Sequence, residues 1–429
     1  MNPTLFSKFV GSAWNNLQQF FELFNGKRQK PTYYHKDRLR KEYSADQKWE
    51  SASVNTSYVA ADIVALDSPL PMKQRPTLSR ASGKLPKVGM KKILNESQIQ
   101  AINIMEAQGQ TWQQIAGRLI ADAEACSVGI DEINEFNFLT GLSNGCVVIA
   151  DENSDGGLRL DFNYQPEKSF GVETANDLQL SDIERVLNKA NDDGNTIAEI
   201  WIAKSTYDKL RQTRAARELV ATYNGQAYTD QTTLPVPTAG RFDEAFADQY
   251  GGVQFVKVDR SVNIEKNGKR TPVKPFNPNK LVFTIGGEVG ALVWGQLAEQ
   301  TNPVNGVLYN VVDQYKLISK YSKNEPFSEI TSGQALCLPV IENVDQIYTI
   351  DITDAQSVDT TAEGADPSDQ YVTIWGKKYT KANFIAAMKA AGMSVSTTAT
   401  DDTIIKKVNK LSDEEETALK EAVAGFVVA

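Results

Sequence analysis

The feature that most constrains this chain is a proline-free segment of helical periodicity that runs from Thr111 to Gly145. Its apolar side chains recur at the spacing of one helix face: Trp112, Ile115, Leu119, Ala123, Ile130, Ile133 and Phe136. Thr111 and Gln114 form a capping box at its start, and Gly141 or Gly145 could supply the residue that ends it. A helix of this length would be a rod of roughly 40–50 Å, which needs an extended partner surface. We predict that it is the spine of the fold, with core residues Trp112, Ile115, Leu119, Ile133 and Phe136.

The size and composition of the chain limit the classes of protein to which it can belong. With 429 residues it can bury a large core, and we expect two or three compact units. The net charge of −9 argues against a surface coated with nucleic acid, which requires a basic protein. Cys126, Cys146 and Cys337 lie far apart without disulfide or metal-ligand spacing, as expected in a reducing cytosol. Because no apolar run approaches the roughly 20 residues that a membrane crossing needs, we expect no membrane contact.

The first 55 residues are predicted to form an N-terminal arm. Residues 5–24 have the pattern of an amphipathic helix. Polar residues interrupt its apolar face, unlike a signal peptide, and its polar face carries only Lys8, unlike a membrane-surface helix. We expect this helix to pack on a partner subunit.

Residues 27–43 are the one clearly basic stretch, in which seven Lys and Arg residues face only Asp37 and Glu42. Tyr33 and Tyr34 lie among them, and basic residues interleaved with aromatic ones suit contact with a nucleic acid. The alternative is an arm that pairs with acidic neighbours in an acidic protein. The residues that would face DNA are Lys27, Arg28, Lys30, Lys36, Arg38 and Arg40.

Residues 56–95 are too long for an ordinary connection and too poor in apolar residues to fold on themselves. Residues 59–66 have the pattern of a strand. The prolines that follow, Pro69, Pro71, Pro76 and Pro86, exclude a helix and a central strand. We expect an arm that becomes ordered on another molecule, followed by a short helix over residues 96–108.

Beyond Gly145 the periodicity changes from helical to alternating, which predicts a β-hairpin over residues 146–164. Its turn begins like a calcium-binding loop, with Asp151, Asn153, Asp155 and Gly156. The twelfth position of such a loop should be a bidentate Glu, and here it is Phe162. We therefore interpret the segment as a turn and predict no metal site.

Residues 172–280 alternate between the two periodicities and predict a compact α/β unit. Its helices are expected at 181–189, 205–211, 215–223 and 242–249, and its strands at 197–203 and 253–258, with a further strand at 281–285 after a polar, proline-containing excursion over 263–279. Extended segments follow at 287–297, 307–324 and 335–352. An acidic linker over 354–370 then leads to a separate small unit, 371–429, with a first strand at 371–375 and a helix at 381–391.

No catalytic constellation can be recognised. His35 is the only histidine, and it lies in the basic stretch with no Ser or Cys elbow and no second histidine, which argues against a triad or a zinc site. Phosphate-binding glycine motifs are also missing, and we expect no cofactor. A hydrolase with a buried pair of carboxylates stays open as an alternative.

The order of these elements resembles the major capsid protein of tailed bacteriophages, with the Hong Kong phage (Johnson) fold, and most of all the lambda-type coat proteins. The segments that carry the resemblance are VALDSPLPMKQR at 64–75, IDEINEFNFLTGLSNG at 130–145, LRLDFNY at 158–164, DLQLSDIERVLNKANDDGNTIAEIWIAKSTYDKLRQ at 177–212 and SGQALCLPVIENVDQI at 332–347. The resemblance covers roughly residues 30–350.

The resemblance implies an α+β fold and a role for each segment. Residues 56–95 would be an extended loop over a neighbouring subunit, with contacts from Pro69, Pro71, Lys73, Arg75, Arg80, Lys84 and Lys87. Residues 96–171 and 281–325 would form the peripheral domain, 172–280 the axial domain, and 326–353 a returning strand region. Residues 371–429 have no counterpart in the lambda-type pattern.

The function implied is that of a structural protein, not an enzyme, whose copies assemble into pentamers and hexamers of an icosahedral head around double-stranded DNA. Its main partner would be itself. Scaffold, portal and decoration proteins are further possible partners, and packaged DNA would be contacted only weakly. The alternative is the shell of a cellular protein nanocompartment with the same fold.

Overall fold

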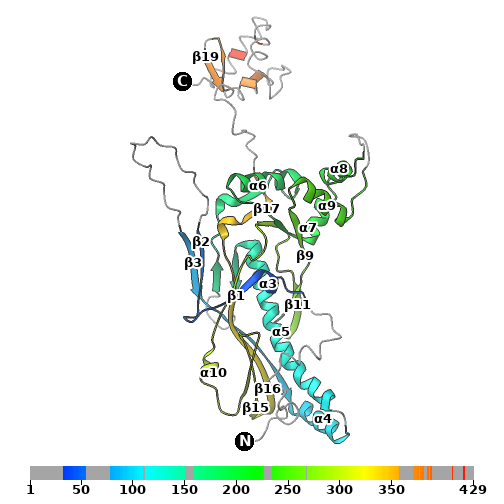
Figure 1. Cartoon of the computed structure of the whole chain (residues 1–429), viewed down its shortest axis with the longest axis vertical. Coiled ribbons are helices and arrows are strands. Elements are labelled where there is room, and N and C mark those ends of the chain that lie inside the picture. The colour runs from blue at the N-terminus through cyan, green and yellow to red at the C-terminus, as the bar shows by residue number, and fades with distance from the viewer. Residues whose placement is uncertain are drawn as a thin grey trace, which may run out of the picture. The chain divides into compact units, whose positions relative to one another are not determined.

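The computed structural model describes residues 32–54, 78–109, 112–149, 158–226, 234–266 and 268–356, together with 371–375, 377–380 and positions 384, 385, 387, 388, 408, 419 and 420. The chain divides into two compact units, residues 1–356 and 357–429. The first unit contains a long helix on a large sheet and a smaller α/β body (Figure 1). The α+β class is thereby confirmed.

The spine helix exists as predicted. Helix α5 runs from Trp112 to Asn144 over 33 residues, and helix α4 (Glu96–Ala107) precedes it. Gly145 ends α5 with a positive φ of 68°, and its amide donates to the Gly141 carbonyl at 2.8 Å. Glycine is favoured there because it has no Cβ to oppose the left-handed conformation. The predicted capping box at Thr111 lies outside the described residues.

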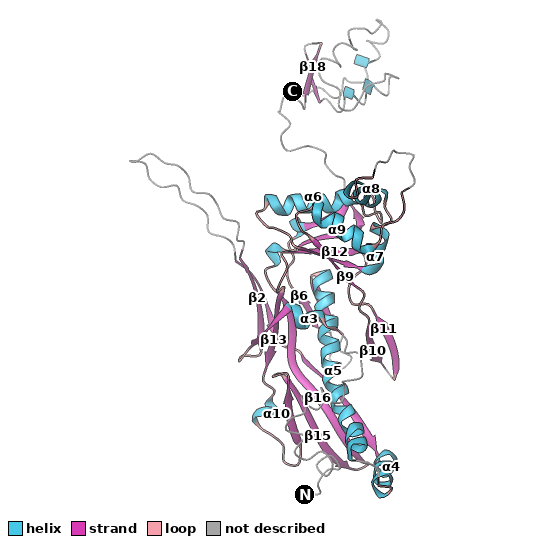
Figure 2. Cartoon of the chain, turned by 45° about the vertical axis from the view of Figure 1, so that its right-hand side comes forward, coloured by secondary structure: helices cyan, strands magenta, loops and turns pink. Residues whose placement is uncertain are grey.

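A six-stranded sheet packs against α5 (Figure 2). Its order is β1 (Leu39–Tyr43), β13 (Gly290–Gly295), β16 (Phe327–Ile341), β15 (Lys316–Asn324) and β14 (Leu308–Val312), and β4 (Lys87–Asn95) also pairs with β16. The 15-residue strand β16 pairs along one edge with β4 in its first part and with β13 in its last part. Only β1 runs parallel to its neighbour in this sheet, so the arm enters the sheet beside β13.

The α/β body has a five-stranded sheet of its own. Its order is β7 (Ser169–Val172), β17 (Tyr348–Ala355), β12 (Lys280–Thr284), β8 (Glu199–Ala203) and β9 (Gln254–Val258). The helices are α6 (Leu180–Asp192), α7 (Lys204–Leu210), α8 (Arg214–Tyr223) and α9 (Ala239–Gln249), at the predicted places. Their apolar faces form a second core with the sheet, which includes Ile183, Val186, Tyr207, Phe242, Phe246 and Phe255.

Two strands belong to a different sheet than predicted. We expected 281–325 to be peripheral strands and 326–353 a returning region, but β12 and β17 both lie inside the α/β sheet. β12 is a buried strand with an apolar run, whereas β17 alternates apolar and polar residues, and neither pattern tells which sheet a strand joins. The α/β body is therefore discontinuous in sequence, and the chain crosses between the two sheets more than twice.

The predicted extended loop is shorter than expected, because residues 87–95 pair with β16 of the same chain. Pro86 lies just before this strand, where its missing N–H costs no ladder bond. The excursion predicted over 263–279 also contains regular structure, the hairpin β10 (Val262–Lys266) and β11 (Lys269–Val273). Its prolines suggested irregular backbone, but Pro272 lies in an edge strand, where it is tolerated.

Two further antiparallel ribbons complete the first unit. Strands β5 (Cys146–Ile149) and β6 (Leu158–Asp161) form the predicted hairpin, as a sheet of two strands separate from the large one. Strands β2 (Lys48–Val54) and β3 (Leu78–Lys84) form the other ribbon. The strand predicted at 59–66 and the turn at 151–157 lie outside the described residues.

The C-terminal unit contains the hairpin β18 (Tyr371–Ile374) and β19 (Lys377–Thr380). The first strand was predicted and the second was not. A small core gathers on it, which includes Ile374, Tyr379, Phe384, Ile385, Met388, Val408 and Leu419. Of the predicted helix 381–391, the described positions 384, 385, 387 and 388 are helical.

Close approach of α5 to the sheet depends on Gly333 of β16. A Cβ at this position would lie 2.8 Å from Cβ of Cys126 and 3.2 Å from its carbonyl oxygen. We expect Gly333→Ala to lower the free energy of unfolding by about 1–3 kcal/mol, since the helix backbone must move to relieve the overlap. Chemical unfolding of unassembled subunits measures this.

The matched control is Gly240→Ala in α9, where no atom lies within 4 Å of the new Cβ. It should be neutral or stabilising by up to about 1 kcal/mol, because alanine is the better helix former. Equal effects of the two substitutions would contradict the packing role given to Gly333.

Candidate functional site

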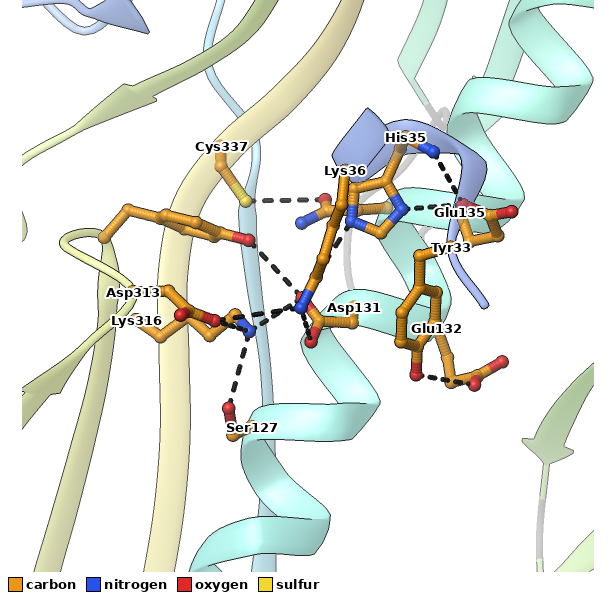
Figure 3. A network of polar contacts seen from close by, with 12 residues as sticks. Tyr33, His35, Lys36, Ser127, Asp131, Glu132, Glu135, Asp313, Lys316 and Cys337 are labelled. Atoms are coloured by element: carbon orange, nitrogen blue, oxygen red, sulfur yellow. Dashed lines mark hydrogen bonds and ion pairs between the residues drawn. The ribbon is translucent and has the colours of Figure 1, made fainter. Parts of the chain in front are cut away.

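The basic arm is attached to the middle of the spine helix by a partly buried polar cluster, the arm cluster (Figure 3). It is defined here as Tyr33, His35, Lys36, Asp131, Glu132, Glu135, Asp313 and Lys316. Helix α3 (Tyr34–Arg38) presents its start to the carboxylate of Glu135. The backbone amides of Tyr34 and His35 each donate to this carboxylate at 3.0 Å, and Nδ1 of His35 lies 2.7 Å from Oε2. Glu135 is fully buried, so three donors converge on a carboxylate that water does not reach.

In the second half of the cluster, acidic and basic side chains alternate. Asp131 Oδ2 pairs with Lys36 Nζ at 2.7 Å, and its Oδ1 pairs with Lys316 Nζ at 2.7 Å. Lys316 is fully buried and also pairs with Asp313 at 2.7 Å. Burial raises the pKa of Asp313, but the charge and hydrogen bond of Lys316, together with the charges of Lys36 and Lys41, outweigh burial, and the pKa is lowered overall. The arm, the helix and the sheet are thus joined through one set of charges.

Aromatic and charged side chains cover the edge of the cluster. The Tyr33 hydroxyl donates to Glu132 at 2.9 Å, and Glu132 is also paired with Arg260 from the α/β body. Burial, followed by the neighbouring Glu132 charge, raises the pKa of Tyr33 far above its ordinary value, so this hydroxyl stays a donor. The arm therefore contacts both the spine helix and the α/β body.

A pocket of about 170 Å³ opens beside the cluster, lined by His35, Lys36, Leu39, Lys41, Leu292, Asp313 and Tyr315. The Nε2 atom of His35 is buried without a hydrogen-bond partner and lies 3.9 Å from Asp131.

Within the described part of the chain, no group of three or more His, Cys, Asp or Glu side chains could hold a metal ion. Among those same residues, no helix is long and apolar enough to cross a membrane.

The predicted DNA-facing residues divide into two groups. Lys36 is held by Asp131, Arg38 pairs with Glu199 at 2.9 Å, and Arg40 pairs with Glu342 at 2.6 Å. For these three, the structure agrees with the alternative interpretation of a basic arm that pairs with acidic neighbours. Lys27, Arg28 and Lys30 lie outside the described residues, and their contact with DNA stays a prediction.

The predicted contacts of the extended loop are only partly described. Pro69, Pro71, Lys73 and Arg75 lie outside the described residues, and Arg80 lies in β3. Lys84 is exposed at the end of β3. Lys87 is exposed at the start of β4, 4.0 Å from Glu299 of the same chain. Their role between subunits stays a prediction.

The buried face of the spine helix differs from the predicted one by a rotation about the helix axis. Ile133 and Phe136 are only half-buried, whereas Ile130, Phe138, Leu139 and Leu142 are fully buried. Trp112, Ile115 and Leu119 lie in the first turns of α5. The shift arises because Asp131, Asn134, Glu135 and Asn137 are also buried. Apolar periodicity misses such positions, and the only signal for them was the basic stretch that they pair with.

A second buried ion pair lies nearer the other end of β15. Lys320 Nζ is 3.7 Å from the Glu329 carboxylate on β16, and both side chains are buried. Burial lowers the pKa of Lys320 to about 8, against the opposing charges of Glu329 and Asp122. Lys316 and Lys320 are four residues apart in one strand, so both side chains lie on the same face of the sheet.

Comparison with known proteins places this architecture in a class. Residues 39–298 match the family model of phage major capsid protein E, and the chain belongs to this family. The match spans more than half of the chain and includes α5, β13 and most of the α/β body. This confirms the resemblance to tailed-phage coat proteins. The chain is accordingly a major capsid protein, a structural component of a phage shell and not an enzyme.

Solved structures of low sequence identity are similar to it. A capsid protein of a prophage from Escherichia coli CFT073 is 12% identical, with 78% of this chain and 98% of that chain covered and a TM-score of 0.44. The capsid of cyanophage A-1(L) is 12% identical, with 74% and 90% covered and a TM-score of 0.44. An encapsulin complex from Synechococcus elongatus PCC 7942 is 11% identical, with 74% and 86% covered and a TM-score of 0.34. The comparison with curated proteins gave no match.

Removal of the Glu135 carboxylate should detach the arm. In Glu135→Ala, two backbone amides and the His35 ring lose their acceptor, and each buried donor without a partner costs about 1–3 kcal/mol. We expect the free energy of unfolding to fall by at least about 3 kcal/mol, and the amides of Tyr34 and His35 to exchange faster with solvent. Glu342→Ala is the control, since its partner Arg40 is half-exposed and such pairs contribute about 0–1 kcal/mol.

The stability of the folded subunit should depend on the titration of Lys320. Its pKa is about 8 in the folded chain and 10.5 ordinarily, so between these values the unfolded chain binds more protons. Stability relative to Lys320→Met should therefore rise as pH increases from 8 to 10.5, and stay level below pH 8. Unfolding of both proteins at pH 7.5, 8.5 and 9.5 tests this, with exposed Lys323→Met as control. If the difference in unfolding free energy between the two proteins did not change over this pH range, the lowered pKa of buried Lys320 would be contradicted.

Proposed function

We propose that copies of this chain form hexamers and pentamers that close into an icosahedral head around double-stranded viral DNA, assembled in the host cytoplasm. The observation that carries the proposal, within the capsid family, is the β2–β3 ribbon. Its two strands pair with each other and with no other strand among the described residues. Isolated two-stranded ribbons are marginally stable in water, so this one gains by lying on a neighbouring subunit.

The base of the ribbon is fixed on its own subunit. Trp49 of β2 is buried with its ring 5.9 Å from that of Phe162. Gly83 faces Trp49 across the ribbon, and a Cβ there would lie 2.8 Å from the indole nitrogen. The Leu85 amide donates to the Gln47 carbonyl at 2.9 Å. A fixed base gives the ribbon a defined direction, as a contact repeated in every subunit requires.

Contacts of this kind are heterologous, since the ribbon of one copy would meet a different surface on the next. Heterologous contacts close into rings when the rotation between copies permits, and rings of five and six are the units of an icosahedral shell. The axial role of the α/β body, near the centre of each ring, belongs to the same proposal.

Other partners follow from charge. With a net charge of −9 and with Lys36, Arg38 and Arg40 engaged by carboxylates, this chain would contact packaged DNA weakly, through Lys27, Arg28 and Lys30 at most. Weak contact leaves the DNA free to leave the head. Scaffold, portal and decoration proteins are further proposed partners, and the unit 371–429 is a candidate contact for one of them.

Removal of the residues that link β2 to β3 should separate folding from assembly. Val54 and Leu78 face each other in the ribbon, so residues 55–77 can be replaced by the two-residue turn Asn-Gly. We expect a folded subunit with an unfolding midpoint close to that of the full chain, and no shells, tubes or rings by negative-stain microscopy.

A second variant, in which a Gly/Ser segment of equal length replaces residues 55–77, distinguishes chain length from side-chain contacts. It should also fail to assemble. Normal particles from both variants would refute a role of residues 55–77 in assembly, and a full-length chain that stays monomeric at every concentration would refute the proposed function itself.

A further inference from the structure

The α/β body carries its charges unevenly along the chain. Residues 166–203 contain eight acidic and three basic residues, a net charge of −5. Residues 204–274 contain twelve basic and eight acidic residues, a net charge of +4 in a protein whose overall charge is −9. One body therefore holds an acidic half and a basic half.

The acidic half leaves its carboxylates at the surface. Glu173, Asp177, Glu184 and Asp192 are exposed in α6 and in the loop before it, and we call them the acidic flank. The three cations of this half are engaged within the chain. Lys189 pairs with Asp193 at 3.0 Å, Arg185 donates to the Gly171 carbonyl, and Lys168 donates to the Asp345 carbonyl.

The basic half exposes cations on α7 and on the β10–β11 hairpin. Lys204, Lys269, Arg270 and Lys274 are exposed, and we call them the basic flank. Lys274 pairs with Asp259 at 2.9 Å, and Arg270 pairs with Glu265 at 2.8 Å. The pKa of Asp259 is lowered by the hydrogen bond from Lys274 and by the charges of Lys274 and Lys204. The four cations of the flank outnumber the two carboxylates that pair with them, so the flank keeps a positive surplus.

The two flanks lie on opposite sides of the body. Strands β7 and β9 are the two edges of the five-stranded sheet; the acidic loop follows β7, and the basic hairpin follows β9. In both views of the chain, α6 lies on one side, and α7 and the β10–β11 hairpin lie on the other (Figures 1 and 2). Opposite charges on opposite sides are what a head-to-tail contact between identical copies needs.

We propose that the acidic flank of one copy docks on the basic flank of the next copy around the ring, and that this pairing sets the order of subunits in a capsomer. The inference rests on the proposed function and names the surface that closes its rings. A contact of the basic flank with nucleic acid would leave the matching acidic flank without a role. A second copy of the chain supplies partners for both.

Charge reversal tests the contact. Variant A carries Lys204→Glu, Lys269→Glu, Arg270→Glu and Lys274→Glu, so that both its flanks are acidic. Variant B carries Glu173→Lys, Asp177→Lys, Glu184→Lys and Asp192→Lys, so that both its flanks are basic. Because like charges then meet at every contact, each variant alone should need at least about tenfold more protein to assemble than the unmodified chain. Light scattering and negative-stain microscopy measure the onset of assembly.

An equimolar mixture of A and B gives the sharper readout. Alternating copies satisfy every contact in a ring of six, whereas a ring of five must contain one like-charged contact. The mixture should therefore form hexameric rings, flat sheets or tubes but no closed shells. The combined variant, with all eight substitutions in one chain, is the matched control, since both flanks are reversed and remain complementary. It should form closed shells.

Each other outcome overturns the proposal. If A or B assembles like the unmodified chain, or if the mixture assembles no better than its components, the flanks do not meet. Variants that assemble normally but lose binding to double-stranded DNA would assign the basic flank to nucleic acid instead. If A does not fold, Lys204→Gln with Lys274→Gln replaces it, with a smaller expected loss. Failure of the unmodified chain to form any particle would instead count against the proposed function.

Discussion

The rest of the first unit depends on the placement of a few charges between the spine helix and the elements that cover it. Asp131 and Glu135 are one helical turn apart in α5, and each is buried against a cation or a donor of the arm. Lys316, from the far side of the same cluster, is fully buried in the sheet. Charges removed from water require their partners at close range, so arm, helix and sheet can meet in only one arrangement. Apolar side chains alone would tolerate a shift of the helix along the sheet.

The same constraint couples the large sheet to the α/β body. Arg38 of the arm reaches Glu199 at the start of β8, and Arg260 after β9 reaches Glu132 of the spine helix. The chain also crosses between the two sheets from β12 to β13 and again from β16 to β17. Covalent crossings fix the distance between the two bodies, and the ion pairs fix their rotation. A displacement of the α/β body is in this way transmitted to the large sheet.

Whether a feature of the structure could be predicted from the sequence depends on how far apart in the chain its interacting residues lie. The periodicity of 111–145 predicted α5, and the alternating patterns after residue 172 predicted the helices and strands of the α/β body, because both signals are local. The sheet that β12 joins is decided by a pairing with β17 nearly 70 residues away, and no local pattern carries that information. The arm cluster could not be predicted from the sequence for a related reason. Apolar periodicity gives no reason to place Asp131 and Glu135 in the interior, and their partners Lys316 and His35 lie about 185 and 100 residues from them in the sequence.

A buried ionic cluster is an expensive way to stabilise a protein, since the desolvation of its charges offsets most of their attraction. Its advantage is geometric. A shell is built from many copies of one subunit, so an error in the internal arrangement of the subunit is repeated in every copy. Hydrogen-bonded charges such as those around Glu135 define direction as well as distance, whereas apolar packing defines mainly volume. For a protein whose many copies build one shell, conformational uniqueness at the junction of arm, spine and sheet is worth more than the stability that a purely apolar junction would give.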